Sequence, residues 1–135
     1  MMRRVIAAAG LLGLASCGGP TASLIVEDVT CRPPLTDGGT AVAYFSVTSS
    51  IADRITGVSS PSAAAVEIHE STASGGMASM QELEFVELPA GQSVTFAPGG
   101  MHIMIISPDK TGPNATIPVR IALQSGREAA FDCTF

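Results

Sequence analysis

Short apolar runs, each ended by turn-forming residues, restrict the fold of this chain more than any other feature. Residues 40–48 (TAVAYFSVT) alternate between apolar and polar positions, which is the pattern of a half-buried strand. Clusters of Gly, Pro, Asp and Ser separate this run from similar ones along the chain. Beyond the first 17 residues, no window of 11–18 residues keeps the period of an amphipathic helix. The sequence therefore predicts a single all-β domain, a sandwich or a barrel.

Eight or nine strands are expected from these runs. They are predicted at residues 24–30, 40–48, 54–59, 64–69, 80–88, 93–96, 101–106, 117–123 and 128–135. Residues 71–79 (STASGGMAS) are small and mostly polar, and we predict a flexible loop there. Ser125 and Gly126 should turn the chain between the last two strands, which then form a closing hairpin.

The first 17 residues have the form of a bacterial lipoprotein export segment. After a basic start, the apolar run at residues 5–14 is too short to span about 30 Å of hydrocarbon. It ends in Leu-Ala-Ser-Cys, where small residues admit the signal peptidase and the Cys17 thiol receives the lipid. We predict a signal peptide at residues 1–16, a lipidated Cys17 and spacer at 17–23, and a periplasmic domain at 24–135. The alternative is an ordinary thiol near a plain cleavage site.

The charge of the exported part is strongly negative. All twelve acidic residues lie beyond Cys17, but only five of the seven basic ones do, which leaves a net charge of −7. Such a surface repels nucleic acid and attracts cations. It offers no polybasic patch for a membrane, so contact with the membrane is expected through the lipid anchor only.

Two cysteines remain if Cys17 is lipidated. Cys31 and Cys133 lie near the two ends of the predicted domain. If the first and last strands are neighbours, a disulfide would close a loop of about 100 residues and stabilise the fold by roughly 4–5 kcal/mol in the chain-entropy model. Two buried free thiols are the alternative. A metal role is not expected, because thiols oxidise in exported proteins.

Both histidines of the chain and four of its six methionines fall between residues 69 and 104. Two imidazoles and two thioethers, from His69, Met80, His102 and Met104, form a soft donor set that suits Cu(I) and suits Mg, Ca or Mn poorly. Strand alternation places His102 and Met104 on one face. The alternative is that the two histidines are unrelated surface residues.

The other members of this cluster follow from the same alternation. His69 is expected at the end of its strand, on the face of Glu67 and opposite Ile68, where the mouth of a site would lie. Met80 would close over the metal from beyond the flexible loop. Met101 is predicted to be a core residue. For Met77 three roles stay open: a residue at the rim of the site, a spare thioether for copper transfer, or an exposed side chain without a role.

Other chemistries find little support in the sequence. There is no third histidine for a His₃ zinc site, no CxxC pair and no GxSxG nucleophile elbow. A blue-copper carrier needs a cysteine beside its histidines, and Cys133 has none near it. An enzyme is therefore not expected, since four protein ligands leave no open coordination position for a substrate.

The spacing His69–x10–Met80–x21–His102–x–Met104 resembles the signature of the periplasmic copper chaperones called PCuAC. The segments VEIHE at 66–70, LPAG at 88–91 and PGG at 98–100 are similar to that family as well. The resemblance implies a cupredoxin-like β-sandwich of Greek-key type that holds one Cu(I) on those four residues.

The resemblance also implies a partner that accepts the copper. Members of the family are associated with delivery to the dinuclear copper centre of cytochrome c oxidase, often beside a Sco-type protein. Two other readings stay open at this point: a copper-buffering or resistance lipoprotein without a dedicated client, and a metal-free sandwich that binds another envelope protein.

Overall fold

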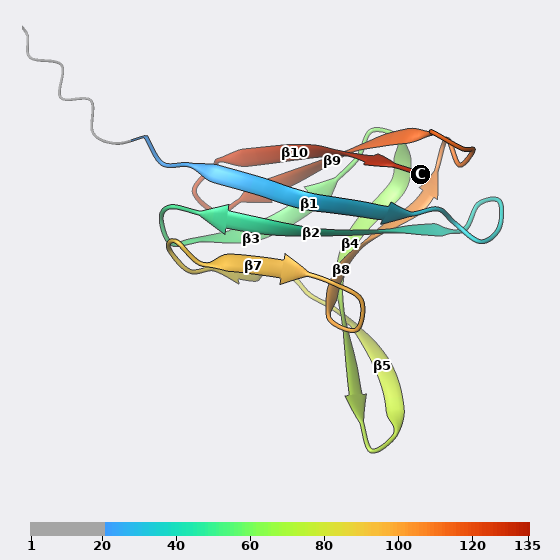
Figure 1. The fold of residues 1–135 in the computed structure, drawn as a ribbon, viewed down its shortest axis with the longest axis horizontal. Helices are drawn as coiled ribbons and strands as arrows, with labels where there is room; N and C mark the ends of the chain where they lie inside the picture. The colour runs from blue at the N-terminus through green and yellow to red at the C-terminus, as the bar shows by residue number, and fades with distance from the viewer. Residues whose placement is uncertain (1–20) are drawn as a thin grey trace, which may run out of the picture.

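The computed structural model describes residues 21–135, which form ten strands in two antiparallel sheets (Figure 1). The strands are β1 Leu24–Arg32, β2 Thr40–Ser49, β3 Asp53–Ser59, β4 Ala63–Ser74, β5 Met77–Glu82, β6 Val86–Leu88, β7 Ser93–Phe96, β8 Met101–Pro108, β9 Thr116–Leu123 and β10 Glu128–Thr134. The predicted signal peptide at 1–16 and the lipid acceptor Cys17 lie outside the described residues. Within residues 21–135, no helix is long and apolar enough to cross a membrane.

The sheets pair strands that are distant in sequence, and the all-β sandwich predicted from the sequence is confirmed. The first sheet has the order β1-β2-β8-β4-β5, with β7 also paired to β2. The second has the order β10-β9-β3-β6. In the first sheet β8 lies between β2 and β4, so segments that are distant in the chain become neighbours.

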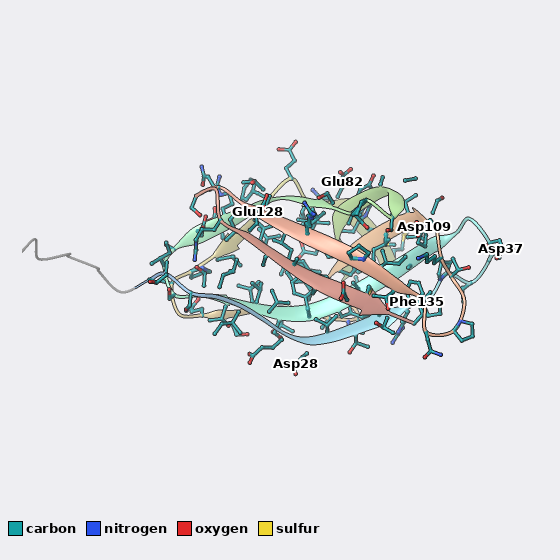
Figure 2. The ribbon with its side chains drawn as sticks, turned by 90° about the horizontal axis from the view of Figure 1, so that it is seen from above. Asp28, Asp37, Glu82, Asp109, Glu128 and Phe135 are labelled. Carbon is teal, nitrogen blue, oxygen red and sulfur yellow. A yellow bond between two sulfur atoms is a disulfide. The ribbon has the colours of Figure 1, made fainter. Side chains whose placement is uncertain are left out.

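The core lies between the two sheets and follows from the alternation in β2. Every second residue of that strand is fully buried, and Phe45 stacks on Phe96 with ring centroids 4.4 Å apart. Phe131 of the opposite sheet reaches Phe45 at 4.9 Å, and such aromatic pairs add about 0.5–1.5 kcal/mol beyond area burial. Side chains fill the space between the sheets, while acidic residues such as Asp28 and Asp37 lie at the periphery (Figure 2).

A disulfide ties the two sheets together at one edge. Cys31 lies on β1 in the first sheet and Cys133 on β10 in the second, and their sulfurs are bonded. Their Cα atoms are 5.5 Å apart although 102 positions separate them in sequence. Of the two alternatives that the sequence left open, the structure contains the disulfide.

A buried carboxylate organises the end of the sandwich where β1 begins. Asp53 accepts hydrogen bonds from the Ser125 hydroxyl and from the Arg127 guanidinium, whose Nη2 lies 2.8 Å from Oδ2. The same guanidinium donates to the Ser49 hydroxyl at 2.7 Å and to the Ser23 carbonyl at 3.3 Å. The Ser125 hydrogen bond, followed by that of Arg127, holds the pKa of Asp53 well below its usual range.

The prediction of a flexible loop at residues 71–79 was wrong. The strand that begins at Ala63 continues to Ser74, and Met77 starts the next strand after only two residues. Those two residues, Gly75 and Gly76, have φ of 61° and 78°, the left-handed conformation that a tight hairpin turn of type I′ needs. The hairpin of β4 and β5 projects from the body of the sandwich (Figure 1).

The single strand predicted at residues 80–88 is also two strands. β5 pairs with β4 in the first sheet, whereas β6 pairs with β3 in the second. The chain crosses between the sheets at residues 83–85, where Leu83 packs against the core. This crossing places the start of the segment beside His69 in the first sheet and its end at the edge of the second sheet.

Candidate metal centre

The two histidines face each other across neighbouring strands. His69 on β4 is the direct register partner of His102 on β8, and their ring centroids are 6.0 Å apart. Ile68 and Ile103, which alternate with them, are buried in the core, so both imidazoles lie on the outer face of the first sheet. His102 is only 6% exposed and the side chain of His69 only 17%.

The two predicted thioethers lie on the same face, on either side of this pair. Met104 follows His102 by two residues on β8, and Met80 on β5 is the register partner of Ser71, two residues beyond His69. Direct cross-strand neighbours have Cβ atoms about 4.5–5.5 Å apart and diagonal ones about 7–8 Å. The register thus brings all four predicted residues to one patch, with Met80 57% exposed at the edge.

Several details differ from the sequence-based expectation. His69 lies in the middle of a long strand, not at its end, because β4 runs on into the projecting hairpin. Met80 is held in that hairpin by pairing and not by a mobile loop. Met77 pairs with Ser74 on the opposite face from Met80 and is 77% exposed. Met101 packs against the core, as predicted.

In each histidine, one ring nitrogen makes a hydrogen bond and the other makes none within residues 21–135. His102 Nδ1 donates to the Gly100 carbonyl at 3.1 Å, so the lone pair of this neutral ring is on Nε2. His69 Nε2 lies 2.8 Å from the Glu67 carboxylate, so the free nitrogen is Nδ1. That Nδ1 is buried and has no hydrogen-bond partner among the residues that the structure describes. A buried lone pair without a partner is costly, and a metal ion would satisfy it.

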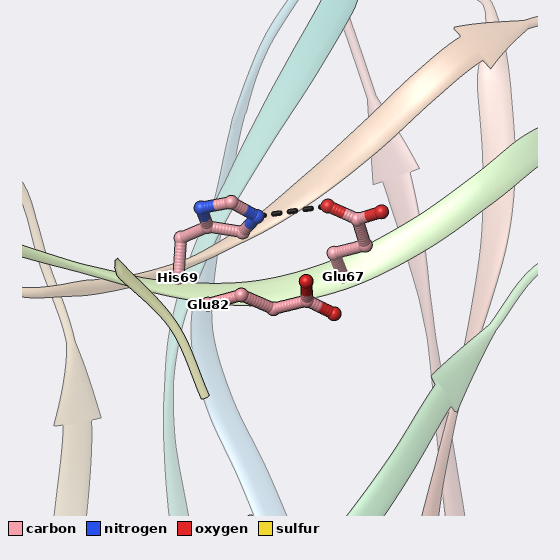
Figure 3. Close-up of side chains that lie close together, drawn as sticks. All are labelled: Glu67, His69 and Glu82. Carbon is pink, nitrogen blue, oxygen red and sulfur yellow. Dashed lines mark hydrogen bonds and ion pairs between the residues drawn. The ribbon is translucent and has the colours of Figure 1, made fainter. Parts of the chain in front are cut away.

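Two carboxylates that the sequence analysis did not assign lie beside His69. Glu67 precedes it by two residues on β4, and Glu82 is its register partner on β5. One ligand atom from each of the three residues lies within 4.8 Å of the others (Figure 3). Alternation had already placed Glu67 on the face of His69, whereas Glu82 follows only from the register of the hairpin.

A small cavity lies next to these carboxylates. It has a volume of about 180 Å³ and lies between β3, β4 and residues 82–84, where β5 ends and the crossing begins. Its lining residues are Thr56, Gly57, Val58, Val66, Glu67, Ile68, Glu82, Leu83 and Glu84. Three of them are glutamates, so the cavity adds to the negative charge around His69.

Several solved structures share this fold, among them PCuAC domains. The apo PCuAC domain of PmoF2 is 26% identical, with a TM-score of 0.63 over 82% of this chain and 86% of that one. The copper-bound PCuAC domain of PmoF2 is 24% identical, with a TM-score of 0.64 over 82% and 89%. Apo-DR1885 from Deinococcus radiodurans is 20% identical, with a TM-score of 0.59 over 99% and 95%. The chain therefore has the β-sandwich fold of the PCuAC domains, which confirms the resemblance found in the sequence.

The chain belongs to the family described as "Putative lipoprotein LpqE-like", whose profile matches residues 24–134. A curated relative, "Putative lipoprotein Lxx21020" from Leifsonia xyli subsp. xyli, is 31% identical over 72 residues. That alignment covers 50% of this chain and 43% of the relative, so it spans less than half the length of that protein.

Proposed function

We propose that this protein is an extracytoplasmic copper chaperone that binds one Cu(I) through His69, His102, Met80 and Met104. The observation that carries the proposal is the pair of imidazoles in direct register, each with one ring nitrogen free. The buried Nδ1 of His69, which has no hydrogen-bond partner within residues 21–135, is where a cation is most needed.

The donor set explains how the ion would be both held and released. Neutral imidazoles and thioethers are soft ligands that favour Cu(I), and they leave the bound ion with its charge of +1. Met80 is the most exposed of the four and lies on an edge strand. It is therefore the ligand that an incoming acceptor would replace first, with the remaining three exchanged in turn.

Relatives of the same fold support this proposal. Structures are known of a copper-bound PCuAC domain from PmoF2 and of CuI-DR1885, which is 22% identical with a TM-score of 0.59. Four protein ligands around one ion leave no position for a substrate, so the protein would carry copper and not catalyse a reaction on it.

The proposal also covers where the protein is located and which protein accepts its copper. A lipid on Cys17 would hold the domain at the envelope, in agreement with the lipoprotein descriptions of the family and of the relative. The bonded cysteines suit an oxidising compartment. The proposed acceptor is the dinuclear centre of cytochrome c oxidase or a Sco-type protein. A deletion strain should then lose oxidase activity at limiting copper, whereas a copper-buffering protein would matter only at excess copper.

A Cu(I) competition titration under reducing conditions tests the site. The protein should bind one equivalent, and the His69→Ala/His102→Ala variant should lose tight binding. Met77→Leu is a matched control, because this thioether lies on the opposite face of the same hairpin. Binding that persists without both histidines would contradict the proposed ligand set.

A further inference from the structure

A second group of possible metal ligands lies beside the proposed Cu(I) site. It consists of three hard or borderline donors, from Glu67, His69 and Glu82. Their ligand atoms lie within 4.8 Å of one another. Figure 3 shows Glu67 hydrogen-bonded to the imidazole and the carboxylate of Glu82 close to both. Bonds of about 2.0–2.2 Å from a metal to nitrogen or carboxylate oxygen place two ligand atoms up to about 4 Å apart, so only small side-chain shifts would close this cluster around an ion.

We propose that Glu67, His69 Nε2 and Glu82 form a second binding site, for a divalent cation of the Zn(II) or Cu(II) type. Two carboxylates and one imidazole suit such ions, whereas the thioethers of the first site suit Cu(I). The two sites differ in their donors and share only the ring of His69. This inference does not depend on the proposed copper function, because no methionine takes part in the second site.

The charges around the cluster support a divalent ion. The arginine ion pairs within residues 21–135 join Arg54 to Glu87 and Arg127 to Asp53, and none reaches Glu67 or Glu82. Apart from the imidazole of His69, no basic side chain among the described residues pairs with either carboxylate, so their charge is free to match that of a divalent cation. Glu82 is exposed on the edge strand and also lines the adjacent cavity, so an ion can reach the cluster from solvent.

The shared imidazole makes the two sites alternatives. A neutral ring has one lone pair. Cu(I) on Nδ1 keeps the proton on Nε2, which then donates a hydrogen bond to the Glu67 carboxylate. A divalent ion on Nε2 would instead require the proton to be on Nδ1. His69 therefore serves one ion at a time.

Zn(II) titration against a chromophoric chelator tests the proposal, with Glu82→Gln as the main variant. We expect one equivalent to bind and the variant to weaken that binding about tenfold or more. Because this side chain is exposed on an edge strand, the fold should be retained. Glu84→Gln is the matched control, since Glu84 lines the same cavity but is not part of the three-residue cluster, and it should leave the Zn(II) affinity unchanged.

The Met80→Leu/Met104→Leu variant separates this proposal from the copper function. It should keep the Zn(II) affinity of the unmodified protein while it loses Cu(I) affinity. Co(II) can replace Zn(II) in this test, and its visible spectrum should show that the variant still binds the divalent ion. Zn(II) binding that Glu82→Gln leaves unchanged, or that Glu84→Gln weakens equally, would overturn the second site.

Discussion

The Gly100 carbonyl fixes the orientation of His102. It accepts a hydrogen bond from the imidazole at 3.1 Å and another from the backbone nitrogen of Ser71 at 3.0 Å. The Gly100 nitrogen in turn donates to the Ala97 carbonyl at 3.0 Å, which closes the turn before β8. An acceptor of this kind sets the tautomer of a neutral histidine, and Glu67 does the same for His69.

Replacing either proposed thioether by leucine should affect copper and little else. Met80→Leu and Met104→Leu keep the apolar volume, so each should cost less than about 1.5 kcal/mol in stability. Each removes one soft donor, and we expect Cu(I) affinity to fall by about tenfold or more. Chelator competition and thermal unfolding measure the two effects. Unchanged Cu(I) affinity in both variants would exclude the methionines as ligands.

Asp53 should make stability depend on pH. Its pKa is lowered in the folded protein by the Ser125 and Arg127 hydrogen bonds, so its contribution is complete above about pH 4, the value of an unperturbed carboxyl, and is lost as pH falls below that. Asp53→Asn should lower the free energy of unfolding at pH 7, and the difference from the unmodified protein should shrink towards pH 3. Urea unfolding at both pH values measures this.

Asp132→Asn is the control for that experiment. Asp132 is exposed on β10 and makes no side-chain hydrogen bond among those described. Its replacement should leave the pH dependence of unfolding unchanged. If Asp53→Asn lowers the free energy of unfolding by the same amount at pH 3 and at pH 7, the carboxylate of Asp53 does not act through its charge.

The β4–β5 hairpin is the element on which the site depends. It contributes His69 and Glu67 from one strand and Met80 and Glu82 from the other, and its register determines which of them share a face. Every residue of β5 is exposed, so the core adds little to hold the strand in place. Its position therefore depends on hydrogen-bonded pairing with β4 and on the turn at Gly75 and Gly76.

Alanine in the turn should weaken copper binding without unfolding the sandwich. Gly75 and Gly76 have positive φ, where alanine costs about 1–2 kcal/mol for each residue. The Gly75→Ala/Gly76→Ala variant should therefore exchange its β5 amide hydrogens faster and bind Cu(I) less tightly. Gly112→Ala, at a position with open space and no positive φ, should do neither. Unchanged exchange in β5 would show that the turn does not set the hairpin.

In the molecule as a whole, the disulfide lies far from the proposed metal sites. The disulfide joins β1 and β10, whereas the proposed sites lie near the opposite edge of the first sheet, around β4 and β5. The Asp53 network also lies away from that edge. Under the proposed function, the exposed hairpin would exchange metal while the sandwich stays folded.

Removing the disulfide should therefore lower stability and spare the site. The Cys31→Ser/Cys133→Ser variant should lose about 2–5 kcal/mol of unfolding free energy, because the cross-link closes a long loop in the unfolded chain. Cu(I) affinity of the folded variant should stay within about twofold of the unmodified protein. Denaturant unfolding and chelator competition measure the two quantities, and a large loss of affinity would show that the sheets must be cross-linked for the site to form.

The sequence predicted those features that depend on local patterns. Alternation in residues 40–48 identified β2, and the spacing of the histidines and methionines selected a set that the register brings to one face. The hairpin was missed because Gly75-Gly76 was taken as part of a loop, although two glycines between strands are a known turn signal. Glu82 could not be placed beside His69 without that register, since it depends on pairing across the turn.

X-ray absorption of the Cu(I)-loaded protein tests the proposed ligand set most directly, because it distinguishes sulfur from nitrogen or oxygen around the ion. The unmodified protein should show two sulfur and two nitrogen ligands. Met80→Leu should lose one sulfur, and Met77→Leu should lose none. A copper environment with no sulfur, or one that Met80→Leu and Met104→Leu both leave unchanged, would contradict the account.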